Sequence, residues 1–168
     1  MSNDKRNRRL VLILIGVIIV GSIYGVYRIV TWDPDLIVSV DQGDRVILNS
    51  ARGANLIGIR CLPRQSPLGE DAAAFVEARV LDGDTRLVRG AEPTDKVTDF
   101  DWVYVYYRDK GVERMLNAEL VRAGLAIAHP QGLNTGHRKE IKTAEDEAKA
   151  ARRGLWAPEN ADQLKALR

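Results

Sequence analysis

The sequence is poor in the residues from which nucleophilic and metal sites are often built. Its 168 residues include one cysteine, Cys61, and two histidines, His129 and His137. A single cysteine excludes an intramolecular disulfide, and no Cys/His cluster has the spacing of a zinc site. No motif supports a Ser-His-Asp or Cys-His site either. We therefore interpret Cys61 as a small residue at a strand end rather than as a reactive thiol.

An excess of charge of one sign is also missing from most of the chain. The formal net charge is +2, and the first 35 residues account for it with five Lys or Arg against three Asp or Glu. The remaining 133 residues carry 20 cations and 20 anions. Because neutralisation of phosphates drives non-specific binding of nucleic acid, this balance disfavours nucleic acid as the partner, although a local basic face stays open.

One long hydrophobic run is present near the amino terminus. Eighteen uncharged residues, LVLILIGVIIVGSIYGVY, cover positions 10–27, and Arg28 can snorkel so that the run extends to position 30. We expect residues 10–30 to form a transmembrane helix rather than a cleaved signal peptide, because the run is long and lacks an A-x-A-like cleavage site. Gly21 and Gly25 form a G-x-x-x-G pair within it, which permits close packing of two helices.

The charges beside this run predict its orientation. Four cations precede it in a basic tail, residues 1–9, whereas Asp33 and Asp35 follow it in a linker, residues 31–35. The positive-inside rule places the tail in the cytoplasm. The sequence therefore predicts a single-pass membrane protein whose soluble domain is periplasmic or otherwise extracytoplasmic.

The soluble part reads as short strands interrupted by helices. β-branched and aromatic runs predict strands at 36–40, 45–50, 54–59, 86–90 and 102–107. Apolar residues at helical spacing predict helices at 66–81, 113–126 and 137–156. The order β-β-β-α-β-β-α-α predicts an α+β fold, built on a small, partly open, five-stranded OB-like β-barrel with three helices. Residues 36–157 would form this domain and residues 158–168 a carboxy-terminal tail.

Four stretches of this domain carry a resemblance to a known family. They are LIGI at 56–59, GEDAAAF at 69–75, NAELVRAGLA at 117–126 and AEDEAKAARRGLW at 144–156. In this order they resemble the staphylococcal-nuclease-like, or thermonuclease, domain, of which Asn-x-x-Leu-Val-x-x-Gly-Leu-Ala and a closing Gly-Leu-Trp are characteristic. The resemblance covers about residues 36–157. It implies the OB-like barrel with three helices and, in active members, calcium-dependent hydrolysis of DNA or RNA phosphodiester bonds.

The resemblance also implies site residues that this chain largely lacks. Active members use two arginines, a Glu that serves the attacking water, and Asp ligands for calcium. Here Asn55 and Phe100 stand at the two arginine positions, Arg60 stands at one metal-ligand Asp, and Cys61 replaces the neighbouring Thr. Positions 62–65 offer no carboxylate for the water. The acid of the first hairpin, Asp44, is the position that matches.

These departures predict a membrane-anchored nuclease-like domain that is catalytically inactive. Arg60 would repel a calcium ion and could pair with Asp44 instead. We expect no catalytic residue, no cofactor and no metal site, with calcium relevant only to an active nuclease. The domain would then act as a binding or accessory module, with a protein partner in a larger membrane assembly.

Two alternatives stay open. The first is an active membrane-anchored nuclease that rebuilds its site from other acids, the candidates being Glu70, Asp71, Asp82 and Asp99. The second is an OB-fold binder of single-stranded nucleic acid that stacks bases on Trp102, Tyr104 and Tyr106. The DGDT stretch at 82–85 resembles the family's first-hairpin motif but follows a helix, so we interpret it as a turn.

Overall fold

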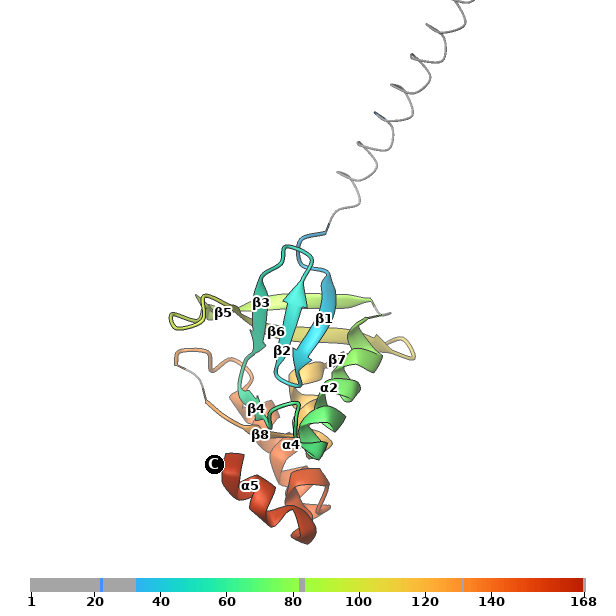
Figure 1. Ribbon diagram of the computed structural model, residues 1–168, viewed down its shortest axis with the longest axis vertical. Helices are drawn as coiled ribbons and strands as arrows, with labels where there is room; N and C mark the ends of the chain where they lie inside the picture. The colour runs from blue at the N-terminus through green and yellow to red at the C-terminus, as the bar shows by residue number, and fades with distance from the viewer. Residues whose placement is uncertain (1–21, 23–32, 82–83, 131, 168) are drawn as a thin grey trace, which may run out of the picture. The chain divides into compact units, whose positions relative to one another are not determined.

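The computed structural model describes Ser22 and residues 33–81, 84–130 and 132–167 (Figure 1). Pro34–Arg168 form a compact unit that is separate from Met1–Asp33. The expected membrane segment, with its basic tail and its G-x-x-x-G pair, lies outside the described residues except for Ser22. Among the described residues, no helix has the length and hydrophobicity needed to cross a bilayer.

A mixed sheet forms the body of the domain. Its strands are β1 (Ile37–Gln42), β2 (Arg45–Leu48), β3 (Gly53–Leu56), β5 (Thr85–Thr94), β6 (Asp101–Asp109) and β7 (Val112–Met115). The pairing order is β1-β2-β3-β6-β5, and β7 also pairs with β6. The first three strands form the expected antiparallel meander, whereas β3 runs parallel to β6. A second, two-stranded sheet consists of β4 (Ile59–Cys61) and β8 (Ala126–Ala128).

The predicted α+β fold is confirmed, but the described strands form a mixed sheet and a two-stranded sheet rather than a five-stranded barrel. The third expected strand is divided, because Gly58 adopts a φ of +82° and turns the chain between β3 and β4. A positive φ favours glycine, which has no Cβ to clash with the backbone. Within the described residues the sheets do not close into a barrel, and β1 and β5 remain the two ends of the longer pairing order.

Four α-helices lie in the described part of the chain, where three were predicted. They are α2 (Pro67–Val80), α3 (Leu116–Arg122), α4 (Arg138–Ala150) and α5 (Ala161–Leu167). The backbone N–H of Gly69 donates to the Ser66 hydroxyl over 3.1 Å, which caps α2, and this helix lies against β1 (Figure 1). The predicted tail instead contains η2 (Pro158–Asn160) and α5, which follow η1 (Gly154–Trp156).

Two further differences arise from pairing between distant segments. Residues 113–115 were predicted to begin a helix, but they belong to β7, because Gly111 turns the chain and Met115 pairs with Tyr106 of β6. Of the three residues of β8, Ala126 was predicted to end that helix and the other two had no predicted structure. They become a strand because β4 provides the antiparallel partner, with Arg60 opposite Ile127.

The family motif around α3 has a clear packing role. Asn117 is fully buried, and its side chain accepts a hydrogen bond from Val105 N over 3.0 Å. It also donates to the carbonyl oxygens of Ile57 over 2.9 Å and Val103 over 3.3 Å. One amide thus joins α3 to β6 and to the turn after β3, and this satisfies backbone groups that have no access to water.

Two glycines, one in each of the last two family stretches, explain why the stretches at 117–126 and 144–156 occur together. Gly124 follows α3 with a φ of +77°, and Gly154 opens η1 with a φ of +50°. Leu155 N donates to the carbonyl oxygen of Gly124 over 2.8 Å. A Cβ at Gly124 would lie 2.2 Å from the carbonyl oxygen of Arg153, and one at Gly154 would lie 2.4 Å from that of Gly124. The two backbones therefore pack at a distance that only glycines allow.

Candidate functional site

Three of the five predicted site positions meet in one cavity. This cavity, which we call the hairpin cavity, has a volume of about 320 Å³ and is lined by Asp44, Asn55 and Arg60. Trp102, a candidate stacking residue, also lines it, together with four groups that the sequence had not assigned to a site: Arg45, Asp95, Thr98 and His129. The strands β2, β3 and β4 thus bring together residues that the family resemblance had placed at one site.

The acid at the first hairpin is held by the backbone. Asp44 is half-buried, and one of its carboxylate oxygens accepts a hydrogen bond from Cys61 N over 2.9 Å. Burial raises the pKa of Asp44 above its usual value, although the Cys61 N–H and the nearby charges of Arg45 and Arg60 oppose this shift. Asp44 and Arg60 are both described, and they do not form the expected ion pair.

Arg60 contacts a histidine instead. Its guanidinium Nη2 lies 2.7 Å from Nε2 of His129, because β4 and β8 pair with Ile59 opposite Ala128. Arginine has no acceptor, so Nε2 of His129 must be unprotonated in this contact. Burial lowers the pKa of His129, and the charge of Arg60 lowers it further, while Asp44 opposes them. Because the sequence has only two histidines, His129 could have been considered as a site residue. Nothing in the sequence, however, placed it beside the end of β4.

Cys61 behaves as the sequence interpretation proposed. Its side chain is buried, and burial raises the pKa of its thiol well above the usual value, with the charge of Asp44 adding to the rise. A thiolate is the reactive form of cysteine, and this environment disfavours it. The backbone N–H of Cys61, rather than its sulfur, takes part in the site.

A cation lies beside the position of the first missing arginine. Arg45 Nε donates to the side-chain oxygen of Asn55 over 3.2 Å, and its Nη1 pairs with Asp41 over 3.2 Å. The Arg45 guanidinium carbon is 5.3 Å from the centroid of the Phe100 ring. Phe100 packs over β3, where a Cβ at Gly53 would lie 2.7 Å from its ring, and it does not line the cavity.

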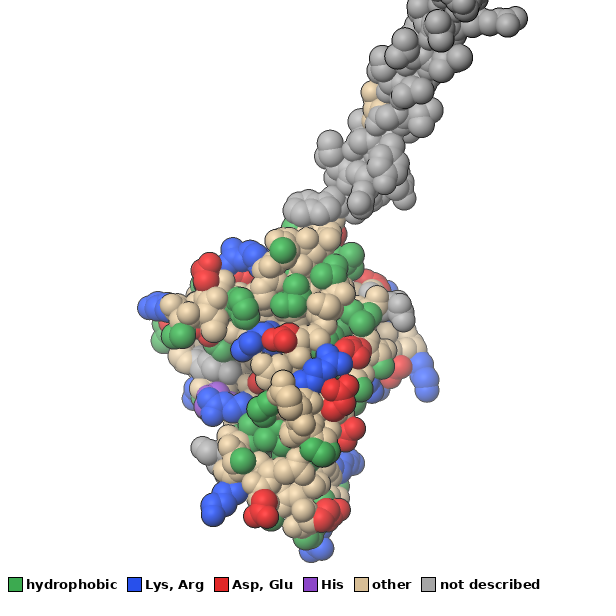
Figure 2. Space-filling model, viewed as in Figure 1, with side chains coloured by type: hydrophobic (Ala, Val, Ile, Leu, Met, Phe, Trp, Pro, Cys, Tyr) green, Lys and Arg blue, Asp and Glu red, His purple; other side chains and the backbone are tan. Residues whose placement is uncertain are grey.

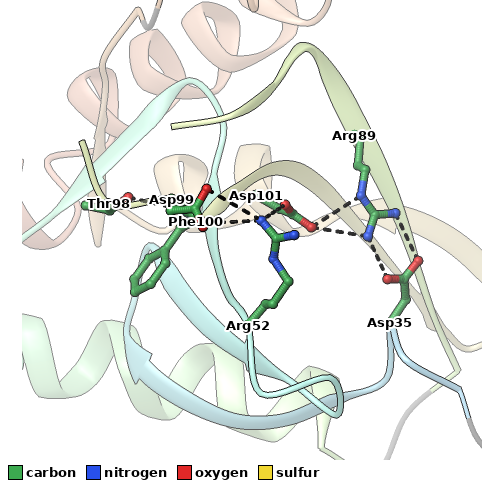
Figure 3. A network of polar contacts seen from close by, with 7 residues as sticks. All are labelled: Asp35, Arg52, Arg89, Thr98, Asp99, Phe100 and Asp101. Atoms are coloured by element: carbon green, nitrogen blue, oxygen red, sulfur yellow. Dashed lines mark hydrogen bonds and ion pairs between the residues drawn. The ribbon is translucent and has the colours of Figure 1, made fainter. Parts of the chain in front are cut away.

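A polar network fixes the chain that leads into β6 (Figure 3). The buried carboxylate of Asp101 lies between Arg52, at 3.1 Å, and Arg89, at 3.2 Å. Arg89 also binds Asp35 over 2.7 and 3.0 Å, while Arg52 donates to the carbonyl oxygen of Asp99 over 3.1 Å. The Asp99 side chain is 93% exposed, so it contributes to this outer network rather than to the cavity.

The other acids proposed for a rebuilt metal site do not gather at the hairpin cavity. Glu70 pairs with Arg64 over 3.0 Å, Asp71 is exposed on α2, and Asp82 lies outside the described residues. In the ranges that the structure describes, no three His, Cys, Asp or Glu residues could share a metal ion. Calcium takes about six to eight oxygen ligands, and this cavity offers two carboxylates beside two guanidinium groups. The residues present therefore do not fit calcium.

The three candidate stacking residues of β6 do not form one open face. Trp102 lines the hairpin cavity, whereas Tyr104 is buried with 5% exposure. The Tyr106 hydroxyl lies 3.1 Å from Nε2 of His137, and the guanidinium of Arg86 is 4.3 Å from the Tyr106 ring centroid. Only one of the three candidate rings is thus available at this cavity.

Comparison with known proteins is informative for the same region. Residues 49–158 match the family described as staphylococcal nuclease homologue. The chain is also 32% identical over 116 residues to "Staphylococcal nuclease domain-containing protein 1" of Drosophila melanogaster, an alignment that covers 60% of this chain. The chain spans about 12% of the length of that relative. These matches confirm the resemblance that the four sequence stretches carry.

Proposed function

The chain belongs to the staphylococcal nuclease homologue family, and we propose that its domain is a catalytically inactive binding or accessory module. We further propose that residues 10–30 anchor it in a membrane, where it joins a protein partner. The observation that carries this proposal is Arg60, a cation in contact with His129 at a position where active members hold a metal ligand.

The chemistry of phosphodiester hydrolysis supports inactivity. The reaction needs a base for the attacking water, and active family members add a divalent ion and cations that stabilise the developing charge. Asn55 takes the place of one cation, and one oxygen of Asp44 is already bonded to Cys61 N. Loss of one transition-state donor typically costs about 100- to 1,000-fold in rate. Losses within one site are not additive, so we do not multiply them.

The proposal of inactivity is tested by a cleavage assay on the full chain in mild detergent. Single-stranded DNA and RNA are incubated with the protein and calcium, magnesium or manganese. We expect no cleavage above the level given by Asp44→Ala protein that was purified in parallel. Cleavage that co-purifies with the protein through two columns, and that Asp44→Ala removes, would support the active nuclease instead.

The full chain also tests the proposal that the hairpin cavity does not bind calcium. Binding of an ion to the folded state alone raises the melting temperature by mass action. We expect millimolar calcium to leave the melting temperature of the full chain unchanged. An increase that Asp44→Ala abolishes would mean that carboxylates other than those predicted complete a site around Asp44.

Membrane anchoring has its own test, which does not depend on catalysis. The eighteen-residue apolar run at 10–27 should hold the chain in membranes after washes with high salt and carbonate, because hydrophobic burial does not depend on charge. A reporter fused after Arg168 should be active outside the cytoplasm, as the positive-inside rule requires. Cytoplasmic reporter activity would reverse the proposed topology.

A further inference from the structure

A second cavity adjoins the hairpin cavity, and His129 lines both. We call it the helix cavity, because one face of α4 supplies much of its wall. Its volume is about 310 Å³. Its floor is formed by Tyr104, which is 5% exposed, and Ile141, which is 3% exposed, with the Gly58 turn beside them. The two cavities therefore offer a polar compartment and a mainly apolar one side by side.

The carboxylate in the helix cavity is already neutralised. Glu145 is buried, and one of its oxygens accepts a hydrogen bond from Ala128 N over 3.1 Å. Its other oxygen lies 2.9 Å from Nζ of Lys142 and 2.6 Å from Nζ of Lys149. These contacts lower the pKa of Glu145 against the effect of burial. The cavity thus presents no uncompensated negative charge to an arriving anion.

Two arginines beside these cavities are available to an anion. Arg138 lines the helix cavity from the start of α4 and is exposed, and Arg60 lines the hairpin cavity and is exposed. Among the described residues, no carboxylate is in ion-pair contact with either guanidinium, and Arg60 contacts the unprotonated nitrogen of His129. By contrast, Arg45 pairs with Asp41, and Lys142 pairs with Asp146 over 2.7 Å. The pair of cavities therefore combines an apolar floor with two arginines that form no ion pair among the described residues, and the carboxylates of Asp44 and Asp95 line the hairpin cavity beside Arg60.

We propose that the two cavities together bind a segment of a partner protein in which a large apolar side chain is followed by carboxylates. The apolar side chain occupies the helix cavity over Tyr104 and Ile141, and the carboxylates bind Arg138 and Arg60. This inference rests on the proposed function as a binding module and names the chemistry of its partner.

Two features favour a protein segment over a nucleic acid. Two exposed aliphatic side chains stand next in the chain to lining residues: Leu133, 72% exposed, precedes Asn134 of the helix cavity, and Val97, 93% exposed, precedes Thr98 of the hairpin cavity. Acidic and basic side chains are interspersed over the face drawn in Figure 2, whereas phosphate backbones select a basic field. Apolar contacts bordered by single charges are typical of protein interfaces.

The inference is tested with the full chain in mild detergent and synthetic pentapeptides. The probe is acetyl-Ala-Phe-Asp-Asp-Ala-amide, and binding is measured by calorimetric titration. Two control peptides replace Phe by Ala or both Asp residues by Asn, and a thymidine pentanucleotide serves as the nucleic-acid probe. We expect saturable binding of the probe, at least about tenfold tighter than any control, because charge-assisted hydrogen bonds and apolar burial both contribute.

Variants then locate the binding site. Arg138→Gln and Arg60→Gln should each weaken the probe by about tenfold, because each removes one charge-assisted contact. Lys139→Gln is the matched control: it removes an exposed cation of α4 that does not line either cavity, and it should leave binding unchanged. All three side chains are exposed, so the variants should keep the melting temperature of the unaltered chain.

Three results would overturn the inference: no saturable binding of the probe at millimolar concentration, equal binding of the Asn peptide, or tighter binding of the pentanucleotide that depends on Arg138. The cleavage assay separates this inference from the proposed inactivity. A chain that cleaves nucleic acid yet binds the probe refutes the inactivity and supports the cavity assignment. A chain that neither cleaves nor binds refutes the cavity assignment alone.

Discussion

Asn117→Ala should destabilise the domain by removing one fully buried side chain that joins three backbone groups. The carbonyl oxygen of Val103 keeps a partner, because it also accepts from Ile57 N over 2.9 Å. Val105 N and the carbonyl oxygen of Ile57 each lose the bond that the Asn117 amide gives them. A buried polar group without a partner costs about 1–3 kcal/mol, so two of them predict a loss of about 2–6 kcal/mol.

The loss is measured by urea unfolding of the full chain in mild detergent, followed by circular dichroism. A typical domain is stable by about 5–15 kcal/mol, so a less stable but folded variant is expected. Thr143→Ala, on the exposed side of α4, is the control and should stay within about 0.5 kcal/mol of the unaltered chain. A loss below about 1 kcal/mol for Asn117→Ala would refute the reasoning, because the orphaned groups would then have found other partners.

Three other substitutions have expected outcomes in the same unfolding assay. Gly124→Ala should cost about 2–4 kcal/mol, because a methyl group would meet a carbonyl oxygen at 2.2 Å and the φ is positive; a neutral result would contradict the backbone contact. Asp101→Asn should cost about 1–2 kcal/mol, since it weakens contacts with two half-exposed arginines, and an increase in stability would contradict this role. Because burial lowers the pKa of His129 below its usual 6.5, the unfolded chain takes up a proton at higher pH than the folded chain. The contribution of His129 to the free energy of unfolding is thus complete above pH 6.5 and falls as the pH drops below this value. His129→Gln should therefore flatten the dependence of the unfolding free energy on pH below 6.5, and an unchanged dependence would refute this role of His129.

The elements that side-chain periodicity specifies were predictable from the sequence. The apolar spacing within 66–81 placed α2 within one residue at each end, and the aromatic run at 102–107 lies within β6. The apolar residues of α4 at spacings of three and four, Ile141, Ala144 and Ala148, are buried, whereas Ala151 of the same pattern follows the helix and is exposed. In these segments local propensity and tertiary packing favour the same structure, so the local sequence pattern is sufficient to predict the element.

The elements that depend on a distant partner were not predictable. Strands β4 and β8 have three residues each, which is too short for a periodic pattern, and they exist because they pair with each other. The turn at Gly58 interrupts an apolar run that reads as one continuous strand. A glycine within a strand pattern is compatible with a bulge or a turn, and the sequence alone does not distinguish them.

The candidate site was predictable in some of its members but not in its contacts. The family resemblance brought Asp44, Asn55 and Arg60 to one place, and they line one cavity. It could not show that Arg60 contacts a histidine 69 positions further along the chain, because that contact follows from the register of β4 on β8. The resemblance did not indicate Arg45, because Arg45 matches none of the family's site positions, although it lines the same cavity.

The residues that identify the family and the residues that would perform its chemistry lie in different parts of this domain. Asn117, Gly124 and Gly154 hold α3 to β6 and to η1 through buried hydrogen bonds and close backbone contact. None of the three lines the hairpin cavity. The packing that keeps these motifs recognisable is therefore independent of the side chains that line the cavity. The motifs predict the fold of this chain, whereas its function has to be argued from the side chains of the cavity.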